Sequence, residues 1–259
     1  MSSALDGSSK GITFFQWMIL GTLTLTSTLY AMSMTIANIA LPQLQGALGA
    51  TQDQIAWTVT FNIIGTAIVT PMTGWLTLRF GQRRLMLCAI FGFATSSILC
   101  GQATALPELV IYRVFQGAFG GPLVPLSQAI ILGVFPRQLH SFATAVWGMG
   151  VVCGPIIGPT VGGYISEAYS WRWIFYIIAP FSLLAFLGAW LYVRNTTHNK
   201  LSKLDWTGFI SLSIAVTALQ LMLDRGNRLD WIDSKEILIE AAVAIICFYI
   251  FALKIVVYF

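Results

Sequence analysis

One arginine lies inside an uncharged, apolar stretch of the sequence. Arg113 occurs in LVIYRVFQGAFGG, and no other charged residue lies between Glu108 and Arg137. An arginine at the centre of a bilayer costs about 2.5 to 3.5 kcal/mol, so it normally faces a cavity or a partner. Gln116 follows on the next helical turn, near the same face. We expect an electrostatic site at Arg113 and Gln116; the alternative is an arginine that reaches along the helix to the outer membrane interface.

A second pattern is a stripe of glycines spaced four residues apart in GVVCGPIIGPTVGG, with two prolines that each follow a glycine: Gly150, Gly154, Pro155, Gly158, Pro159 and Gly162. Residues four apart share one helical face, so these glycines leave a groove where another helix can approach closely. The prolines remove backbone donors and loosen the helix locally. The pattern predicts a bendable contact between helix bundles, with ordinary tight packing as the alternative.

Amide side chains in apolar segments are candidates for ligand contact. Asn38 lies in TIANIALP and Gln128 in PLSQ, and such groups inside a membrane usually meet another helix or a ligand. A basic loop, GWLTLRFGQRRLM, adds two glycines that permit a tight turn and three arginines that can pair with acidic groups or helix C-termini: Gly74, Arg79, Gly81, Arg83 and Arg84.

Catalytic and metal-binding patterns are not found in the sequence. The four cysteines, Cys88, Cys100, Cys153 and Cys247, occur singly, and His140 and His198 are far apart. No paired carboxylates, His cluster or Ser/His/Asp set falls within the apolar segments, which argues against an enzyme, and no cofactor is expected. The basic residues are dispersed along the chain and form no continuous patch, so nucleic-acid binding is not expected either.

The elements that position these residues follow from composition. Hydrophobic residues make up 57% of the 259 residues and charged residues 9%, whereas a soluble domain carries about 25% charged residues. About 20 apolar residues span a bilayer as a helix. Alternating strand patterns are absent, so the sequence predicts an all-α membrane protein. Its eight expected helices cover residues 14–42, 55–78, 85–101, 109–132, 142–165, 173–193, 205–223 and 237–257.

The charge distribution predicts the orientation. With the N-terminus inside the cell, eight of the fourteen basic residues fall in cytoplasmic segments and four in outer loops. Basic residues next to membrane spans are retained in the cytoplasm, so this bias favours a cytoplasmic N-terminus. We expect a cytoplasmic tail at 1–13, a six-helix bundle at 14–193, a cytoplasmic loop at 194–204, and two further helices at 205–259.

Taken in order, these segments resemble the signature motifs of the major facilitator superfamily, and most closely its fourteen-helix drug:proton antiporter branch. The match comprises TIANIALP, the 74–86 loop, the Arg113 segment, the glycine stripe and WRWIF at 171–175. A weaker likeness between PMTGW and PTVGGY fits two inverted three-helix repeats. The resemblance implies a six-helix bundle followed by two linker helices, with the second bundle missing from this chain.

The resemblance also implies a function. It suggests a secondary transporter in the inner membrane that exports amphipathic organic compounds in exchange for protons. Arg113 and Gln116 would serve coupling, and Asn38, Gln116 and Gln128 would line the substrate cavity. In a cell with two membranes, a periplasmic adaptor protein would be a partner.

Two positions depart from the family pattern. Ser33 stands where many relatives have an aspartate, and Leu78 where the loop motif has an acid. None of the ten acidic residues lies near the middle of the first six spans. Two other functions therefore stay open: uptake of a small organic solute, or a truncated membrane protein that does not transport.

Overall fold

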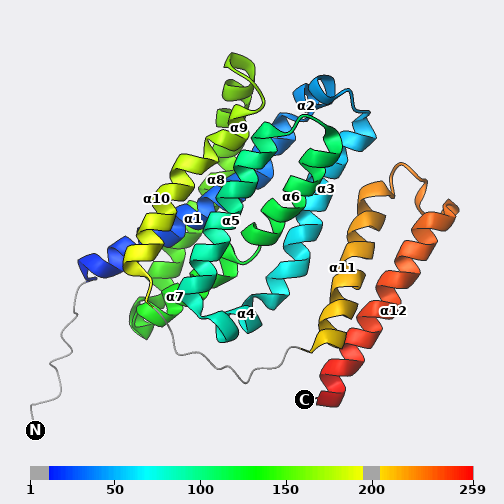
Figure 1. Cartoon of the computed structure of the whole chain (residues 1–259). Helices are drawn as coiled ribbons and strands as arrows, with labels where there is room; N and C mark the ends of the chain where they lie inside the picture. Colours follow the sequence, from blue (N-terminus) through cyan, green and yellow to red (C-terminus); the bar gives the residue numbers. More distant parts are fainter. Residues whose placement is uncertain (1–11, 195–204, 259) are drawn as a thin grey trace, which may run out of the picture.

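The computed structural model describes residues 12–194 and 205–258. These residues form helices joined by short connections, without strands in the described part, and the eight expected membrane spans are confirmed. Figure 1 shows one group of packed helices with a separate helical pair beside it. Most of the expected tail at 1–13 and loop at 194–204, including His198, lies outside the described residues.

The first three spans are α1 (Phe14–Ile39), α3 (Gln52–Val69) continued through η1 (Thr70–Met72) into α4 (Thr73–Phe80), and α5 (Gln82–Gln102). The next three are α6 (Leu106–Gly120) with α7 (Leu123–Val134), α8 (His140–Ala168) after η2 (Arg137–Leu139), and α9 (Trp173–Tyr176) with α10 (Ile178–Tyr192). The last two are α11 (Trp206–Arg225) and α12 (Lys235–Tyr258), with η3 (Trp231–Asp233) between them.

Polar residues fix where several helices begin. Thr13 caps α1 and Thr51 caps α3 through reciprocal bonds with a glutamine three residues later, a pattern that satisfies the free N–H groups of a helix start. Asp205 caps α11 by accepting a hydrogen bond from the Gly208 N–H at 3.0 Å. Between α4 and α5, Gly81 adopts φ 85°, a conformation that residues with a Cβ rarely take, and so permits an abrupt turn.

Three local features differ from the expected spans. The first helix ends at Ile39, and residues expected in a loop form the short helix α2 (Leu41–Leu48), with Pro42 in its first turn. The second span changes to a tighter helix at Pro71, and the fourth is interrupted at Gly121 and Pro122. Proline lacks the N–H that continues a helix, which explains both interruptions. In Figure 1, α4 bends away from the axis of α3.

The six-helix bundle has the same packing in its two halves. The first repeat comprises α1, α3 and α5, and the second comprises α6, α8 and α10. Helix α1 packs against α8 and α10, while its counterpart α6 packs against α3 and α5; α5 and α10 meet between the repeats. This exchange of partners is the pattern of two inverted three-helix repeats. The main apolar core lies between α1, α5, α7, α8 and α10.

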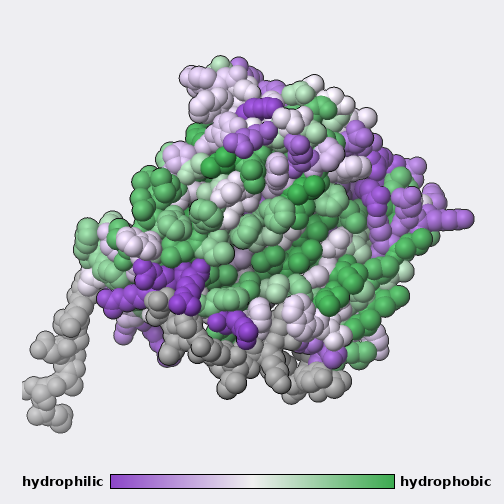
Figure 2. Space-filling model, in the orientation of Figure 1, coloured by the Kyte–Doolittle hydropathy of each residue, from purple (hydrophilic) through white to green (hydrophobic). Residues whose placement is uncertain are grey.

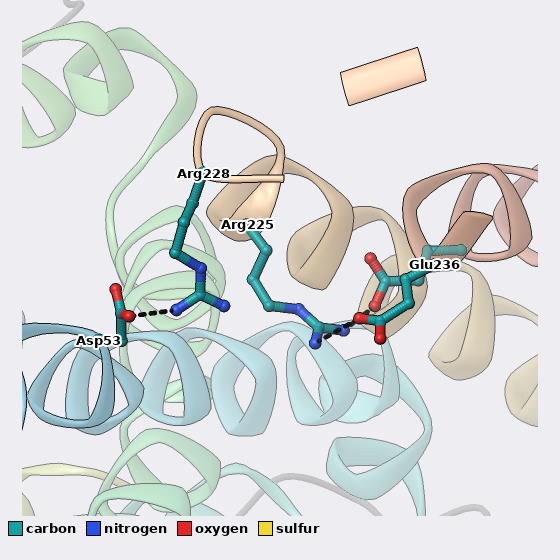
Figure 3. Close-up of polar contacts among 5 residues, drawn as sticks. Asp53, Arg225, Arg228 and Glu236 are labelled. Carbon is teal, nitrogen blue, oxygen red and sulfur yellow. Dashed lines mark hydrogen bonds and ion pairs between the residues drawn. The ribbon is translucent and has the colours of Figure 1, made fainter. Parts of the chain in front are cut away.

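The helical pair α11–α12 packs against the bundle through α3. Charged residues at one end reinforce the contact (Figure 3): Arg228 pairs with Asp53 at 2.9 Å, which links the connection after α11 to the start of α3. Arg225 of α11 pairs with two acidic residues of α12, Glu236 and the largely buried Glu240. Because Asp53 and Arg228 meet, the first and last inter-helix connections lie at the same end of the molecule.

The surface agrees with a membrane setting. Figure 2 shows an apolar band across the middle of the visible face, with hydrophilic residues toward the two ends. Many large apolar side chains are exposed, such as Phe91, Leu183 and Ile245. In water such a surface would drive association, whereas in a bilayer it meets hydrocarbon. The protein is a multi-pass membrane protein.

Candidate functional site

Arg113 lies inside the bundle, where α6 packs against α3 and α5. Its side chain is 1% exposed, and its Nε donates a hydrogen bond to the Thr58 carbonyl oxygen at 3.0 Å. Nη1 donates to Gln116 Oε1 at 2.5 Å, and the guanidinium carbon lies 5.9 Å from the centre of the Phe175 ring. The arginine therefore does not extend to the outer interface but is held by partners within the protein.

Gln116 continues the polar cluster toward α5. It is fully buried, accepts from Arg113, and donates through Nε2 to Ser97 Oγ at 2.7 Å. The hydroxyl of Ser97 in turn donates to the Phe93 carbonyl oxygen at 2.8 Å. A chain of hydrogen bonds thus runs from α6 to α5, and such a network fixes the direction of the guanidinium group.

The positive charge of Arg113 has no acidic partner within the described residues. None of the ion pairs found in ranges 12–194 and 205–258 involves Arg113, and its Nη2 has no hydrogen-bond partner there. Ser33, where the family resemblance leads one to expect an acid, is buried and donates to the Tyr30 carbonyl oxygen at 2.7 Å. An uncompensated buried charge is costly, and such residues in spans commonly serve function.

Two side chains of α3 and one of η1 face carbonyl oxygens of the fourth span at matching four-residue intervals. Asn62 Nδ2 donates to the Arg113 carbonyl at 2.8 Å and Thr66 Oγ1 to that of Gly117 at 3.1 Å, whereas Thr70 Oγ1 donates mainly to the Thr66 carbonyl at 2.7 Å and lies 3.4 Å from that of Gly121. We call this set the α3/α6 ladder. The backbones lie close, since a Cβ at Gly117 would lie 2.0 Å from the Asn62 carbonyl oxygen.

The glycine stripe of α8 packs against α1 of the same bundle. A Cβ at Gly154 would lie 2.6 Å from the Thr28 carbonyl oxygen, and one at Gly158 would lie 2.6 Å from Thr35 Oγ1. Gly150 and Gly162 face Thr24 and Ile36 in the same way. Despite Pro155 and Pro159, α8 is continuous over its whole length. The helix that enters the groove is thus α1, and a role for the stripe in contact with another bundle stays a prediction.

The predicted cavity residues are not brought together. Asn38, near the C-terminal end of α1, and Gln128, in the C-terminal half of the fourth span, are both exposed, while Gln116 is buried with Arg113. Asn38 and Gln128 therefore lie in opposite halves of the bundle. Their contact with a substrate stays a prediction.

The residues of the predicted basic loop are divided between α4, the turn at Gly81 and α5. The predicted tight turn forms at Gly81 alone, because Gly74 lies inside α4. Arg79 lies in the last turn of α4. Arg83 Nη2 donates to the Trp190 carbonyl oxygen at the end of α10, which ties the start of α5 to the sixth span, and Arg84 is exposed.

Several residues of the site were missed by sequence reasoning: Thr58, Asn62, Thr66, Thr70, Ser97 and Phe175. A signal was present for three of them, because polar residues at 62, 66 and 70 recur every four positions in an apolar span, whereas Thr58 contributes its backbone carbonyl, which no residue type reveals. That spacing places them on one helical face, which indicates a polar contact with another helix. Ser97 and Phe175 gave no such signal, because a lone serine or phenylalanine in a span is common.

The family model for the Major Facilitator Superfamily matches residues 23–259. Together with the eight spans and the two repeats, this match shows that the chain belongs to that family of membrane transporters.

Among curated relatives, the chain is 42% identical to the multidrug export protein EmrB of Haemophilus influenzae, over 87% of this chain and 44% of the relative. It is 41% identical to EmrB of Escherichia coli K12, over 88% and 45% of the two chains. The fatty acid resistance protein FarB of Neisseria gonorrhoeae is 38% identical, over 82% and 42%. The chain thus spans about half the length of these relatives.

Solved structures support the fold. The D-xylose-proton symporter aligns with TM-score 0.63 and 16% identity over 89% of this chain and 65% of the other. The human organic anion transporter MFSD10 aligns with TM-score 0.61 and 17% identity over 82% and 56%. At such low identity the likeness concerns fold alone.

Proposed function

We propose that this chain forms the N-terminal bundle and linker helices of a secondary transporter that exports amphipathic organic compounds by proton antiport. The observation that carries the proposal is the identity of about 40% to multidrug export proteins over most of the chain. The buried guanidinium of Arg113 supports it, because its Nη2 has no hydrogen-bond partner and its charge has no acidic partner among the described residues. A transport cycle driven by protons needs charged groups that change partners inside the membrane.

The mechanism we propose is alternating access. A second bundle would enclose a substrate cavity with this one and supply a carboxylate that takes up and releases the coupled proton. Arg113 would interact electrostatically with that carboxylate, while Gln116 and Ser97 hold the guanidinium group in place. Asn38 and Gln128 would contact the substrate from opposite halves of the cavity. The α8 stripe would let this helix shift along α1 as access changes.

The proposed location is the inner membrane, with the N-terminus in the cytoplasm. The described arginines Arg79, Arg83, Arg84, Arg137 and Arg194 belong to one set of connections, which the positive-inside rule assigns to the cytoplasm. The end with the Asp53–Arg228 pair would then face outward. A periplasmic adaptor protein is a further proposed partner in cells with two membranes.

The test is proton-gradient-dependent efflux of a fluorescent amphipathic dye by cells that produce the complete gene product. We expect Arg113→Ala to reduce efflux at least tenfold, because an interaction of a buried charge contributes more than about 1.4 kcal/mol. Arg137→Ala, an exposed arginine in η2, is the matched control and should retain efflux.

Protein level in the membrane is measured for each variant, so that loss of folding is distinguished from loss of transport. Full efflux by Arg113→Ala would remove this residue from the mechanism. Accumulation in right-side-out vesicles rather than in everted vesicles would instead identify uptake.

A further inference from the structure

A crevice of about 380 Å³ lies on the side of the bundle between the second, third and fourth spans. Its walls are apolar and come from α3, α4, α5 and α6, including Leu76, Phe80, Leu85 and Phe119. It lies beside both interruptions of the spans, since Pro122 lines it and η1 directly follows Val69, another lining residue. The crevice thus lies where the second and fourth spans depart from regular helix.

One charged residue lines this crevice, and it is basic. Arg84, in the first turn of α5, is exposed and forms no ion pair with a described acidic residue. At this end of the bundle the described residues include one carboxylate, that of Asp205, which caps α11. Two other crevices between membrane-facing helices, one at Phe91 and Leu183 and one at Tyr169 and Trp173, have no charged lining residue.

We infer that this crevice binds an anionic phospholipid, with an acyl chain against the apolar walls and the headgroup phosphate on Arg84. A crevice in the hydrocarbon layer cannot stay empty without losing contacts, so it takes up hydrocarbon. The cytoplasmic leaflet carries the acidic lipids that basic pockets between spans attract. The inference uses the proposed orientation only to place the crevice in the cytoplasmic leaflet, where acidic lipids occur. It does not depend on transport activity.

Cys88 makes the inference testable in the unaltered protein. It lines the crevice and is exposed, while Cys153 on α8 is exposed elsewhere and Cys100 is buried. The purified protein is placed in vesicles of phosphatidylcholine alone or of phosphatidylcholine with phosphatidylglycerol in both leaflets. Alkylation by N-ethylmaleimide, an uncharged reagent, is followed at each cysteine by peptide mass spectrometry.

We expect phosphatidylglycerol to slow alkylation of Cys88 about fivefold and to leave Cys153 unchanged, because one basic residue near the membrane surface contributes about 1 kcal/mol to binding of acidic lipid. Arg84→Gln should lose this protection, whereas Arg137→Gln, which removes an exposed arginine outside the crevice, should keep it. Equal alkylation of Cys88 in both vesicles, protection that persists in Arg84→Gln, or equal slowing of Cys153 would overturn the inference. These outcomes do not depend on whether the protein exports dye.

Discussion

The α3/α6 and α1/α8 interfaces are equivalent under the inverted-repeat relation, because each joins one helix of the first repeat to one of the second, but they are built differently. Asn62 and Thr66 of α3 donate to carbonyl oxygens of α6, and Arg113 donates back to the Thr58 carbonyl. Along α8, four glycines meet backbone and side-chain atoms of α1, and one side-chain hydrogen bond, from Trp147 to Ser27, joins the two helices nearer the N-terminus of α8. Directional bonds resist sliding, whereas a glycine surface does not. The α3/α6 interface therefore holds a fixed polar site, and a role of the α1/α8 interface as a surface along which a helix shifts stays a prediction.

The largest expected effect comes from adding a single methyl group to each interface. Gly117→Ala should lower the free energy of unfolding by about 2 to 3 kcal/mol and Gly154→Ala by about 1 to 2 kcal/mol, because both overpack a backbone contact and the first also disturbs the ladder. Their Cβ atoms would lie 2.0 Å and 2.6 Å from carbonyl oxygens. The measurement is reversible unfolding in mixed micelles.

Gly148→Ala provides the control for both variants, because a Cβ there meets no atom within 4 Å. It should leave stability unchanged or raise it slightly. The comparison of interfaces fails if Gly117→Ala costs no more than Gly148→Ala.

A smaller loss of stability is expected when one hydroxyl is removed at the α3/α6 interface and one at the α1/α8 interface. Thr66→Val removes the bond to the Gly117 carbonyl and the acceptor of the Tyr30 hydroxyl, and should cost about 1.2 kcal/mol, twice the average of about 0.6 kcal/mol for such bonds in membranes. Thr28→Val removes a bond to Thr24 of the same helix α1 and should cost less. The free energy of unfolding of both variants is measured under identical conditions. Equal losses would mean that the ladder adds nothing beyond ordinary helix packing.

Much of the fold followed from the sequence, and the reason is physical. Uncharged runs longer than the hydrocarbon thickness specify membrane helices almost by themselves, so all eight spans were predicted. The short helix α2 and the breaks at Pro71 and Pro122 were missed. In a lipid environment the neighbouring helices decide whether a proline interrupts a span, and local sequence does not report them.

The candidate site was predictable only in part. Arg113 and Gln116 were identified because a charge in an apolar run demands a partner, yet the partner could not be named: it is a backbone carbonyl of Thr58, which no residue type reveals. The glycine spacing predicted a groove but not that α1 enters it. Which helix faces which is a tertiary property, and a single sequence does not contain it directly.

The difference between the two interfaces is tested most directly by fixing α8 to α1. A Cβ at Gly150 would lie 3.5 Å from Thr24 Cβ, within the range of about 3.5 to 4.5 Å for a disulfide. Thr24→Cys with Gly150→Cys is made in the complete gene product without the unburied native cysteines Cys88, Cys153 and Cys247, and dye efflux is measured after oxidation and after reduction. We predict that oxidation abolishes efflux, that reduction restores it, and that neither single cysteine responds. Full efflux by the cross-linked protein would contradict the account, because α8 would then have no need to move along α1.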